Sequence, residues 1–428
     1  MRCLLILTGL LVLAPAAGAS PPVDPAKQRL PGFSRADLTL LAPLLADGPV
    51  GLVEFADNAL GELPAVNMAV NIDAPADTVV RLISEPQRYP DYLKTVGAVS
   101  IAGRHGSSTV YDWAFRVAIF RLTGRNVMHV YAPRKAADGT SYRTTVRSMG
   151  GDMGTGRSLF RVWSRPSGDS LLAISMRQDL REANYLTRKL MAASSSINRS
   201  ANVSLCMSLL LGFKREAERL GGRADPGGAA TGQGQHLHKP SVQTATLLPL
   251  LFRGDLVWLA PGGEARPQLA VLGLLAHSIA QIRGTLLDAN SFGAALMPGS
   301  YAKVSKRQDN YTFFDWGVRL PLIGVSGSMR LHDEGDVVAA DAMAGAFRGG
   351  RWRFSATPLS PNLSAVLSWA RFDLRHASWL IDRLVNVDPY LEQGLAAASQ
   401  VMLVRALRSR MRKQAQATAA AAQRPASR

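Results

Sequence analysis

Aromatic and charged residues alternate along two short segments, residues 111–124 and 314–327, and these are the strongest candidates for ligand chemistry. Successive side chains of a strand point to opposite faces. Tyr111, Trp113 and Phe115 therefore share one face of the first segment, and they offer a large apolar area. This pattern indicates contact with an apolar molecule rather than proton transfer.

A predicted helix and the second segment each carry an apolar face of the same kind. If the aromatic face lines a space beneath that helix, the helix residues complete a binding surface. The alternative is that these side chains simply fill a core. The predicted ligand-binding residues are Tyr111, Trp113, Phe115, Met207, Leu210, Phe213, Trp316 and Val318.

Arginines alternate with aspartates at two later positions of the chain, around Asp179 and around Asp373. One interpretation is a salt-bridged sheet surface. The other is a cationic mouth that holds the acidic head of a ligand whose tail lies inside. The possible polar ligand contacts are Arg177, Arg181, Arg371 and Arg375.

Acidic and basic residues also share the face opposite the aromatic one. Asp112 and Arg116 stand together in the first segment, and Asp315 and Arg319 stand together in the second. We expect outward ion pairs there rather than polar groups in a cavity.

The chain has no signature of a catalytic nucleophile, a metal-ligand cluster, a phosphate-binding loop or a dinucleotide site. His105 and His129 have no counterpart in the second segment's surroundings, and His236 and His238 lack a third ligand. Residues 150–156 are Gly-rich but lie between strands without a following helix, which is typical of a hairpin. We therefore predict no catalytic residue, no cofactor and no metal.

The two segments belong to a duplication. Trp316 lies 203 residues after Trp113, and Arg371 lies 194 residues after Arg177 in a second matching stretch. The matches keep their order, and a period near 200 residues is too long for a solenoid repeat. The chain therefore contains two whole domains.

Each copy shows the same order of periodicities: a strand, short helices, about six strands and a long helix. The long helices are predicted over 200–220 and 389–412. This order predicts an α+β fold with two tandem helix-grip domains. Each would be a curved antiparallel sheet of about seven strands around a long C-terminal helix.

Composition indicates the boundaries between the signal peptide, the two domains, the linker and the tail. A basic residue, an apolar run too short to span a bilayer and a small-residue site ending at Ala19 are typical of a secretory signal peptide. Cleavage near Ala19 predicts a periplasmic or secreted protein. The expected divisions are a signal peptide at 1–19, domain 1 at 20–220, a Gly/Pro-rich linker at 221–240, domain 2 at 241–413 and a disordered basic tail at 414–428.

The formal charge is +17, and basic residues dominate the end of the chain. Nucleic acid is an unexpected partner for an exported protein, whereas an anionic membrane surface attracts basic residues. A solvated helix end is the alternative. The predicted membrane contacts are Arg405, Arg408, Arg410 and Arg412.

Residues 72–83, followed by 87–93, combine a strand, an Ala-Pro helix start and an aromatic-Pro-x-aromatic-Leu segment. This opening resembles START-like (SRPBCC) helix-grip domains. It is most similar to the branch of polyketide cyclases/dehydrases and lipid-transport or coenzyme-Q-binding proteins. The resemblance covers 64–220 directly, whereas 268–412 joins through its match to the first copy. It implies a fold that hosts carriers, cyclases and sensors.

Two functions follow as hypotheses. The first is an exported carrier of a lipid, isoprenoid or quinone held between sheet and helix, with the principal cavity in copy one. The second is an enzyme of cyclase, aromatase or dehydratase type acting on a polyketide-like or lipid substrate. A scaffold with collapsed cavities is a third possibility.

Overall fold

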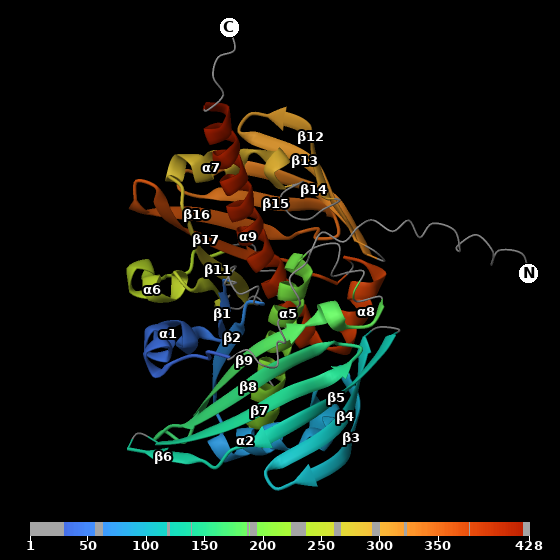
Figure 1. Ribbon diagram of the computed structural model, residues 1–428. Coiled ribbons are helices and arrows are strands. Elements are labelled where there is room, and N and C mark those ends of the chain that lie inside the picture. The colour runs from blue at the N-terminus through green and yellow to red at the C-terminus, as the bar shows by residue number, and fades with distance from the viewer. Residues whose placement is uncertain are drawn as a thin grey trace, which may run out of the picture.

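The computed structural model (Figure 1) describes most of the chain. The described residues are 30–55, 63–117, 120–137, 139–185, 188, 195–223, 237–260, 267–292, 300–320, 323–375 and 377–422. The predicted signal peptide, most of the predicted linker and the last residues of the predicted tail lie outside these ranges. Among the described helices, none combines the length and apolar character needed to cross a bilayer.

The first copy begins with a capped helix and ends with a long one. Its elements are α1 (Arg35–Asp47), β1 (Val50–Glu54), β2 (Val66–Ile72), α2 (Ala76–Ser84), η1 (Pro86–Arg88), α3 (Tyr89–Tyr92), β3 (Val96–His105), β4 (Ser108–Val117), β5 (Phe120–Val130), β6 (Arg134–Ala136), β7 (Gly139–Gly151), β8 (Thr155–Ser164), β9 (Ser170–Asp179), η2 (Leu180–Glu182) and α5 (Ser195–Leu220).

Among the described elements, the second copy repeats the order of the strands without a counterpart of β6, has η3 in place of η1 and α3, and has α8 in place of η2 before its long helix. Its elements are α6 (Thr244–Leu251), β10 (Gly254–Ala260), β11 (Gln268–Leu275), α7 (Ile279–Leu287), η3 (Ala289–Phe292), β12 (Ser300–Gln308), β13 (Tyr311–Leu320), β14 (Ile323–Asp333), β15 (Val338–Gly345), β16 (Arg351–Ser360), β17 (Leu363–Arg371), α8 (Trp379–Val387) and α9 (Pro389–Ala422).

In the described ranges, the strands of both copies form one antiparallel sheet of 17 strands, not two separate sheets. β1 pairs with β2 of its own copy and with β10 of the other, and Leu52 faces Leu256 at the centre of that pairing. Because β1 and β10 hold equivalent places in the two copies, their antiparallel pairing relates the copies like the subunits of a two-fold dimer. β3 and β12 are the two outer edges.

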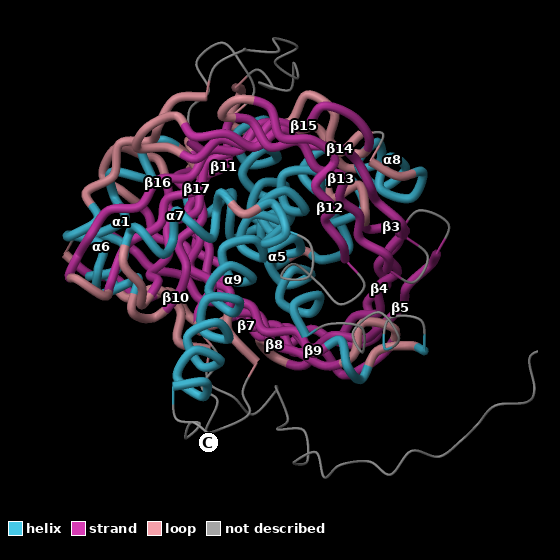
Figure 2. Tube along the Cα trace, turned by 90° about the horizontal axis from the view of Figure 1, so that it is seen from above, coloured by secondary structure: helices cyan, strands magenta, loops and turns pink. Residues whose placement is uncertain are grey.

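The long helices α5 and α9 lie side by side within the curve of the sheet (Figure 2). A glycine permits their close approach, since a Cβ on Gly394 would lie 2.6 Å from the backbone oxygen of Ser204. One hydrophobic core holds residues from both helices and from the inner face of the sheet. A second core lies on the opposite face, where α1 and α6 cover β1 and β10.

The repeated tryptophans and glycines meet across strands. Trp113 stands opposite Gly124, and Trp316 stands opposite Gly327. A Cβ on Gly124 would lie 2.5 Å from the ring of Trp113, so the absence of a side chain lets the indole cover the neighbouring strand. The duplicated pair therefore serves packing within the sheet.

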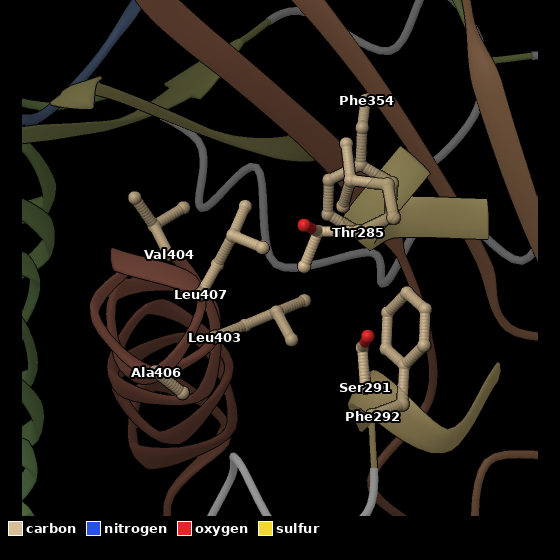
Figure 3. Close-up of a pocket in the computed structure, with 9 residues that line it drawn as sticks. Thr285, Ser291, Phe292, Phe354, Leu403, Val404, Ala406 and Leu407 are labelled. Carbon is tan, nitrogen blue, oxygen red and sulfur yellow. The ribbon is translucent and has the colours of Figure 1, made fainter. Parts of the chain in front are cut away.

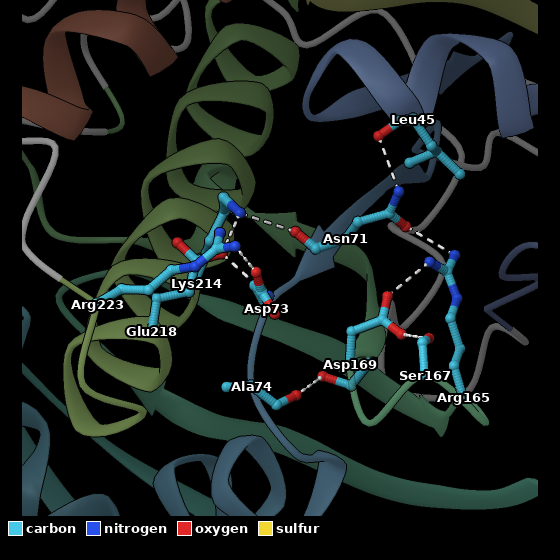
Figure 4. A network of polar contacts seen from close by, with 11 residues as sticks. Leu45, Asn71, Asp73, Ala74, Arg165, Ser167, Asp169, Lys214, Glu218 and Arg223 are labelled. Atoms are coloured by element: carbon cyan, nitrogen blue, oxygen red, sulfur yellow. Dashed lines mark hydrogen bonds and ion pairs between the residues drawn. The ribbon is translucent and has the colours of Figure 1, made fainter.

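The C-terminal end of α5 is tied to β2 by a polar network (Figure 4). Lys214 Nζ donates to the carbonyl of Asn71 over 2.9 Å, and Glu218 accepts from the backbone N–H of Asp73 over 3.0 Å. Asn71 in turn donates to the carbonyl of Leu45 at the end of α1 over 2.9 Å. These contacts fix the helix against the strand that it covers.

Candidate functional site

The predicted ligand-binding residues of copy one lie together beneath α5. Tyr111 and Trp113 from β4 are buried, as are Met207, Leu210 and Phe213 from α5. All five belong to one hydrophobic core. The inward direction of Tyr111 and Trp113 agrees with the two-residue period of the strand.

Aromatic rings fill this interior. The Phe213 ring lies 5.8 Å from Tyr89 and 5.9 Å from Phe160, both edge to face. Tyr89 in turn lies 6.4 Å from Tyr111. Phe115 is half-buried, and its ring lies 4.4 Å from that of Trp113. The surface predicted to line a cavity in copy one is therefore largely in contact with itself.

The tyrosines of this cluster are poor acids. Burial raises the pKa of Tyr111 to about 12, although a hydrogen bond from Asn126 opposes that shift. Burial also raises the pKa of Tyr89 well above its ordinary value, and its hydroxyl donates to the carbonyl of Ile83 over 2.6 Å. Both phenols stay protonated near neutral pH, where they contribute packing and hydrogen bonds.

A small, partly open void of about 20 Å³ lies in copy two, between α9 and the α7–η3 segment (Figure 3). Its lining is mostly apolar. The residues that line it are Thr285, Leu286, Ser291, Phe292, Phe354, Leu403, Val404, Ala406 and Leu407. Trp316 and Val318 are buried in the same copy, with Trp316 stacked on Phe347 at 5.3 Å, but neither lines this void.

A surface cleft of about 330 Å³ adjoins the void. It lies between α7 and the strands β15 and β16, and it shares Leu286 and Phe354 with the void. Lys239, Arg283 and Asp336 supply its charged lining. Leu286 and Phe354 therefore lie where the void and this cleft adjoin.

The two hydroxyl groups at the void are already engaged. Thr285 Oγ1 donates to the carbonyl of Gln281 over 2.9 Å, and Ser291 Oγ donates to Asp288 over 3.2 Å. The void thus offers contact area and no group with a free proton to transfer.

The arginines predicted at a cationic mouth have individual partners. The guanidinium of Arg181 bonds Asp179 over 2.6 Å, and Arg375 repeats the arrangement with Asp373 over 2.5 Å. Arg181 belongs to the turn after β9, so it folds back on Asp179 instead of continuing the strand. Both ion pairs fit the salt-bridged interpretation of this repeated stretch.

Arg177 and Arg371 differ from Arg181 and Arg375 because they lie within strands. Arg177 is 4 % exposed, and Arg371 is half-buried. Burial lowers the pKa of Arg371, and the charge of Arg351 on the next strand lowers it further. Neither residue lines the void or the cleft of copy two.

The structure corrects the prediction for Arg405 and Arg408, whose guanidinium groups point inward and not toward a membrane. They bond the two oxygens of Asp255 over 2.8 and 2.5 Å, and Asp255 is fully buried on β10. Arg405 also donates to the carbonyl of Val53 in copy one over 2.6 Å. A buried carboxylate needs such partners, which explains why helix α9 carries them.

Burial alone would raise the pKa of Asp255. The charges of Arg408 and Arg405 and their hydrogen bonds outweigh it, so the pKa lies below its usual range. Further along α9, Arg410 pairs with Asp288 over 3.1 Å, whereas Arg412 is exposed. Of the four predicted membrane contacts, only Arg412 is a fully exposed cation.

Sequence reasoning missed Asp255 as a partner of α9. The available signal was a single carboxylate inside the otherwise apolar strand 254–260. Such a residue is almost never buried without a cation. Within the described ranges, no cluster of His, Cys, Asp and Glu is arranged to hold a metal ion.

Comparison with solved structures finds proteins of the START superfamily and tandem aromatase/cyclases. The di-domain aromatase/cyclase StfQ of the steffimycin pathway is 12 % identical, with 82 % of this chain and 99 % of that chain covered, at a TM-score of 0.26. The Zhui aromatase/cyclase from Streptomyces sp. R1128 is 20 % identical over 38 % of this chain and 98 % of its own, at 0.29.

A STAR-related lipid transfer protein from Xanthomonas axonopodis is 13 % identical, covering 41 % of this chain and 93 % of its own, at a TM-score of 0.30. No protein-family model and no curated protein matches the chain. At these identities and TM-scores, no residue role or ligand is transferred from the solved structures. The site rests on the contacts described above.

Proposed function

We propose that this protein is an exported carrier that binds an apolar molecule, such as a lipid, isoprenoid or quinone, between the sheet and the C-terminal helix. The observation that carries the proposal is the void beneath α9 and its contact, through Leu286 and Phe354, with the surface cleft. An apolar lining close to solvent suits a ligand that enters and leaves.

The volumes of the void and the cleft determine which side chains must move when a ligand enters. A space of about 20 Å³ holds roughly one water molecule. The cleft of about 330 Å³ is within the range of small-molecule sites. A ligand that enters from the cleft must displace Leu286 and Phe354. Both side chains belong to packed elements, Leu286 to α7 and Phe354 to β16.

Binding is favoured over catalysis by the state of the polar groups. A cyclase or dehydratase needs a group that exchanges a proton in the cavity. Thr285 and Ser291 are the hydroxyl residues at the void, and both already donate to protein acceptors. We therefore retain the carrier as the proposed function.

The test combines extraction of co-purified lipid with a matched pair of variants. Phe354→Ala joins void and cleft, and we expect it to bind a fluorescent fatty-acid analogue more tightly than the wild type. Phe160→Ala is the control, because Phe160 holds the equivalent position in copy one, among packed aromatic rings. Empty wild-type protein, together with no analogue binding by either variant, would refute the carrier.

Export and domain division are part of the same proposal. We propose cleavage near Ala19, domains at 20–220 and 241–413, and a Gly/Pro-rich linker between them. Mass determination of protein from cell envelopes tests the cleavage. Limited proteolysis tests the linker, where cutting within 221–240 should leave two fragments that stay associated through the β1–β10 pairing.

A further inference from the structure

The outer face of the first-copy sheet carries an open hollow of about 540 Å³. Ala98 on β3 and Ala114 on β4 form its floor, because these small side chains leave space above the strands. Arg121, Arg125 and Met149 stand around it on β5 and β7. Trp113 and Gly124 also contribute to its lining, but most of the lining side chains, among them Asp112, Ala114 and Arg121, belong to the outward face of the strands.

In copy two the same position is filled. Tyr301 stands where copy one has Ala98, and Gly317 stands where it has Ala114, each 203 residues later. A Cβ on Gly317 would lie 2.5 Å from the ring of Tyr301, so the tyrosine covers that strand. The hollow is therefore a specific feature of copy one and not a consequence of the fold.

Several arginines stand on these strands, and two of them, Arg121 and Arg125, line the hollow together with Asp112. Arg116 on β4 stands opposite Arg121 on β5, and Arg147 on β7 stands opposite Arg157 on β8. Like charges directly opposite one another destabilise a sheet. An anion that lies between or above such a pair reduces this repulsion.

Copy two has neither pair. Gly324 stands where copy one has Arg121, and Asp341 stands where it has Arg147. Asp341 accepts hydrogen bonds from Arg330 and Arg353 over 2.9 Å each, so the charges of copy two are balanced within the protein.

Among the described residues, three exposed arginines of copy one lack that balance. Asp112 bonds Arg125 over 2.7 Å, and both side chains remain exposed, at 42 % and 57 %. In the part of the chain that the structure describes, no carboxylate is within ion-pair distance of Arg116, Arg121 or Arg147. These three guanidinium groups are exposed and available to a partner.

We propose that this face docks on an anionic lipid bilayer, with the phosphate of one phospholipid headgroup seated in the hollow. Guanidinium groups bind phosphate through paired hydrogen bonds, and an anionic surface attracts several arginines at once. Met149 at the rim is 50 % exposed and offers an unbranched apolar chain to the interface. A spread of charge over three strands suits a surface better than a single small ligand.

The first test removes the unbalanced charges. The triple variant Arg116→Gln, Arg121→Gln, Arg147→Gln should bind vesicles of phosphatidylglycerol and phosphatidylcholine roughly a hundredfold more weakly in co-sedimentation. The control is Lys303→Gln, Lys306→Gln, Arg307→Gln, which removes the same charge from exposed positions of β12. An equal loss in the control, or no loss in the first variant, would overturn the proposal.

The second test fills the hollow with the copy-two residues. Ala98→Tyr combined with Ala114→Gly reproduces the pair Tyr301 and Gly317, an arrangement that the same fold already accommodates. Binding to the anionic vesicles should fall on the order of tenfold, the loss of one charged phosphate contact. Unchanged binding would show that no headgroup occupies the hollow.

A third measurement separates a bilayer from a soluble anion. Inorganic phosphate should release the protein from vesicles no better than sodium chloride of equal ionic strength, because only screening weakens the attraction. Selective release by phosphate would assign the arginines to a soluble phosphate compound and overturn membrane docking. Vesicles of phosphatidylcholine alone should bind neither the protein nor its variants.

Discussion

Copies one and two have a similar order of elements, yet their interiors are packed differently. Copy one packs Tyr89, Tyr111 and Phe213 against one another. In copy two, Phe314 and Leu407 replace Tyr111 and Phe213, and a void lies between α9 and α7. The fold therefore permits a cavity without requiring one, and a few side chains decide whether it exists.

The copies also anchor their long helices differently. Lys214 of α5 bonds the carbonyl of Asn71, and Arg408 of α9 bonds the carbonyl of Leu274, at equivalent places. In copy one Lys214 pairs with Glu218 of its own helix, whereas in copy two Arg408 pairs with Asp255, a fully buried carboxylate of the sheet. A Cβ on Gly273 would lie 2.6 Å from that carboxylate, so the glycine makes room for the ion pair. The bond from the long helix to a strand carbonyl is therefore common to both copies, whereas the ion pair with Asp255 is specific to copy two.

The largest expected effect concerns Asp255. Asp255→Asn leaves Arg405 and Arg408 buried without a charge partner and should lower the free energy of unfolding by about 3–5 kcal/mol. Urea denaturation measures this loss. The control is Asp315→Asn in the same copy, where the carboxylate is exposed. Equal stabilities of the two variants would contradict a copy-specific anchor.

The same residue predicts a pH dependence. Because the folded-state pKa of Asp255 is lowered, its stabilisation is complete above the ordinary Asp pKa and is lost as pH falls through the lowered value. The wild type should therefore lose stability in acid more steeply than Asp255→Asn. Parallel stability curves for the two proteins would contradict this assignment.

A second prediction tests the contact between a tryptophan and a glycine that both copies share. Gly124→Ala would force a Cβ against Trp113, and Gly327→Ala would force one to within 2.4 Å of the carbonyl of Ala344. Each should destabilise the protein by about 1–3 kcal/mol through overpacking, seen in thermal unfolding. Gly284→Ala meets open space and is the control. Tolerance of the change in one copy only would show that the Trp–Gly contacts are not equivalent.

A third prediction makes copy one resemble copy two. Phe213→Leu introduces the residue of position 407 and should cost about 1–2 kcal/mol, since the surrounding rings cannot fully close the space. Binding of a small apolar probe such as xenon should increase in copy one. If stability falls but no probe binds, the aromatic cluster collapses and the two interiors differ by more than one side chain.

The smallest effect belongs to the exposed pair Asp112–Arg125. Its hydrogen bond and charge lower the pKa of Asp112, but the pair is solvated. Asp112→Asn should therefore change stability by less than about 1 kcal/mol, and only above the ordinary Asp pKa. Asp315 faces Ser328 instead of an arginine, so Asp315→Asn should change nothing. A larger loss in copy two would reverse the comparison.

The sequence by itself determined the duplication, the order of elements and the face of the sheet to which many strand side chains point. These features depend on local period and on spacing between matched residues. Tyr111 and Trp113 point inward because every second residue of a strand must share a face. The same offset that matched Trp113 to Trp316 also set Ala98 against Tyr301, so the hollow was readable in the pattern.

Only the tertiary structure decided which groups meet. Arg405 and Arg408 look like solvated helix cations in the sequence, but their partner Asp255 lies about 150 residues earlier on a central strand. The joining of two sheets through β1 and β10, and the closing of copy one's interior by rings from separate elements, are likewise long-range. Local periodicity specifies which face of an element is apolar, whereas packing in three dimensions decides what covers that face.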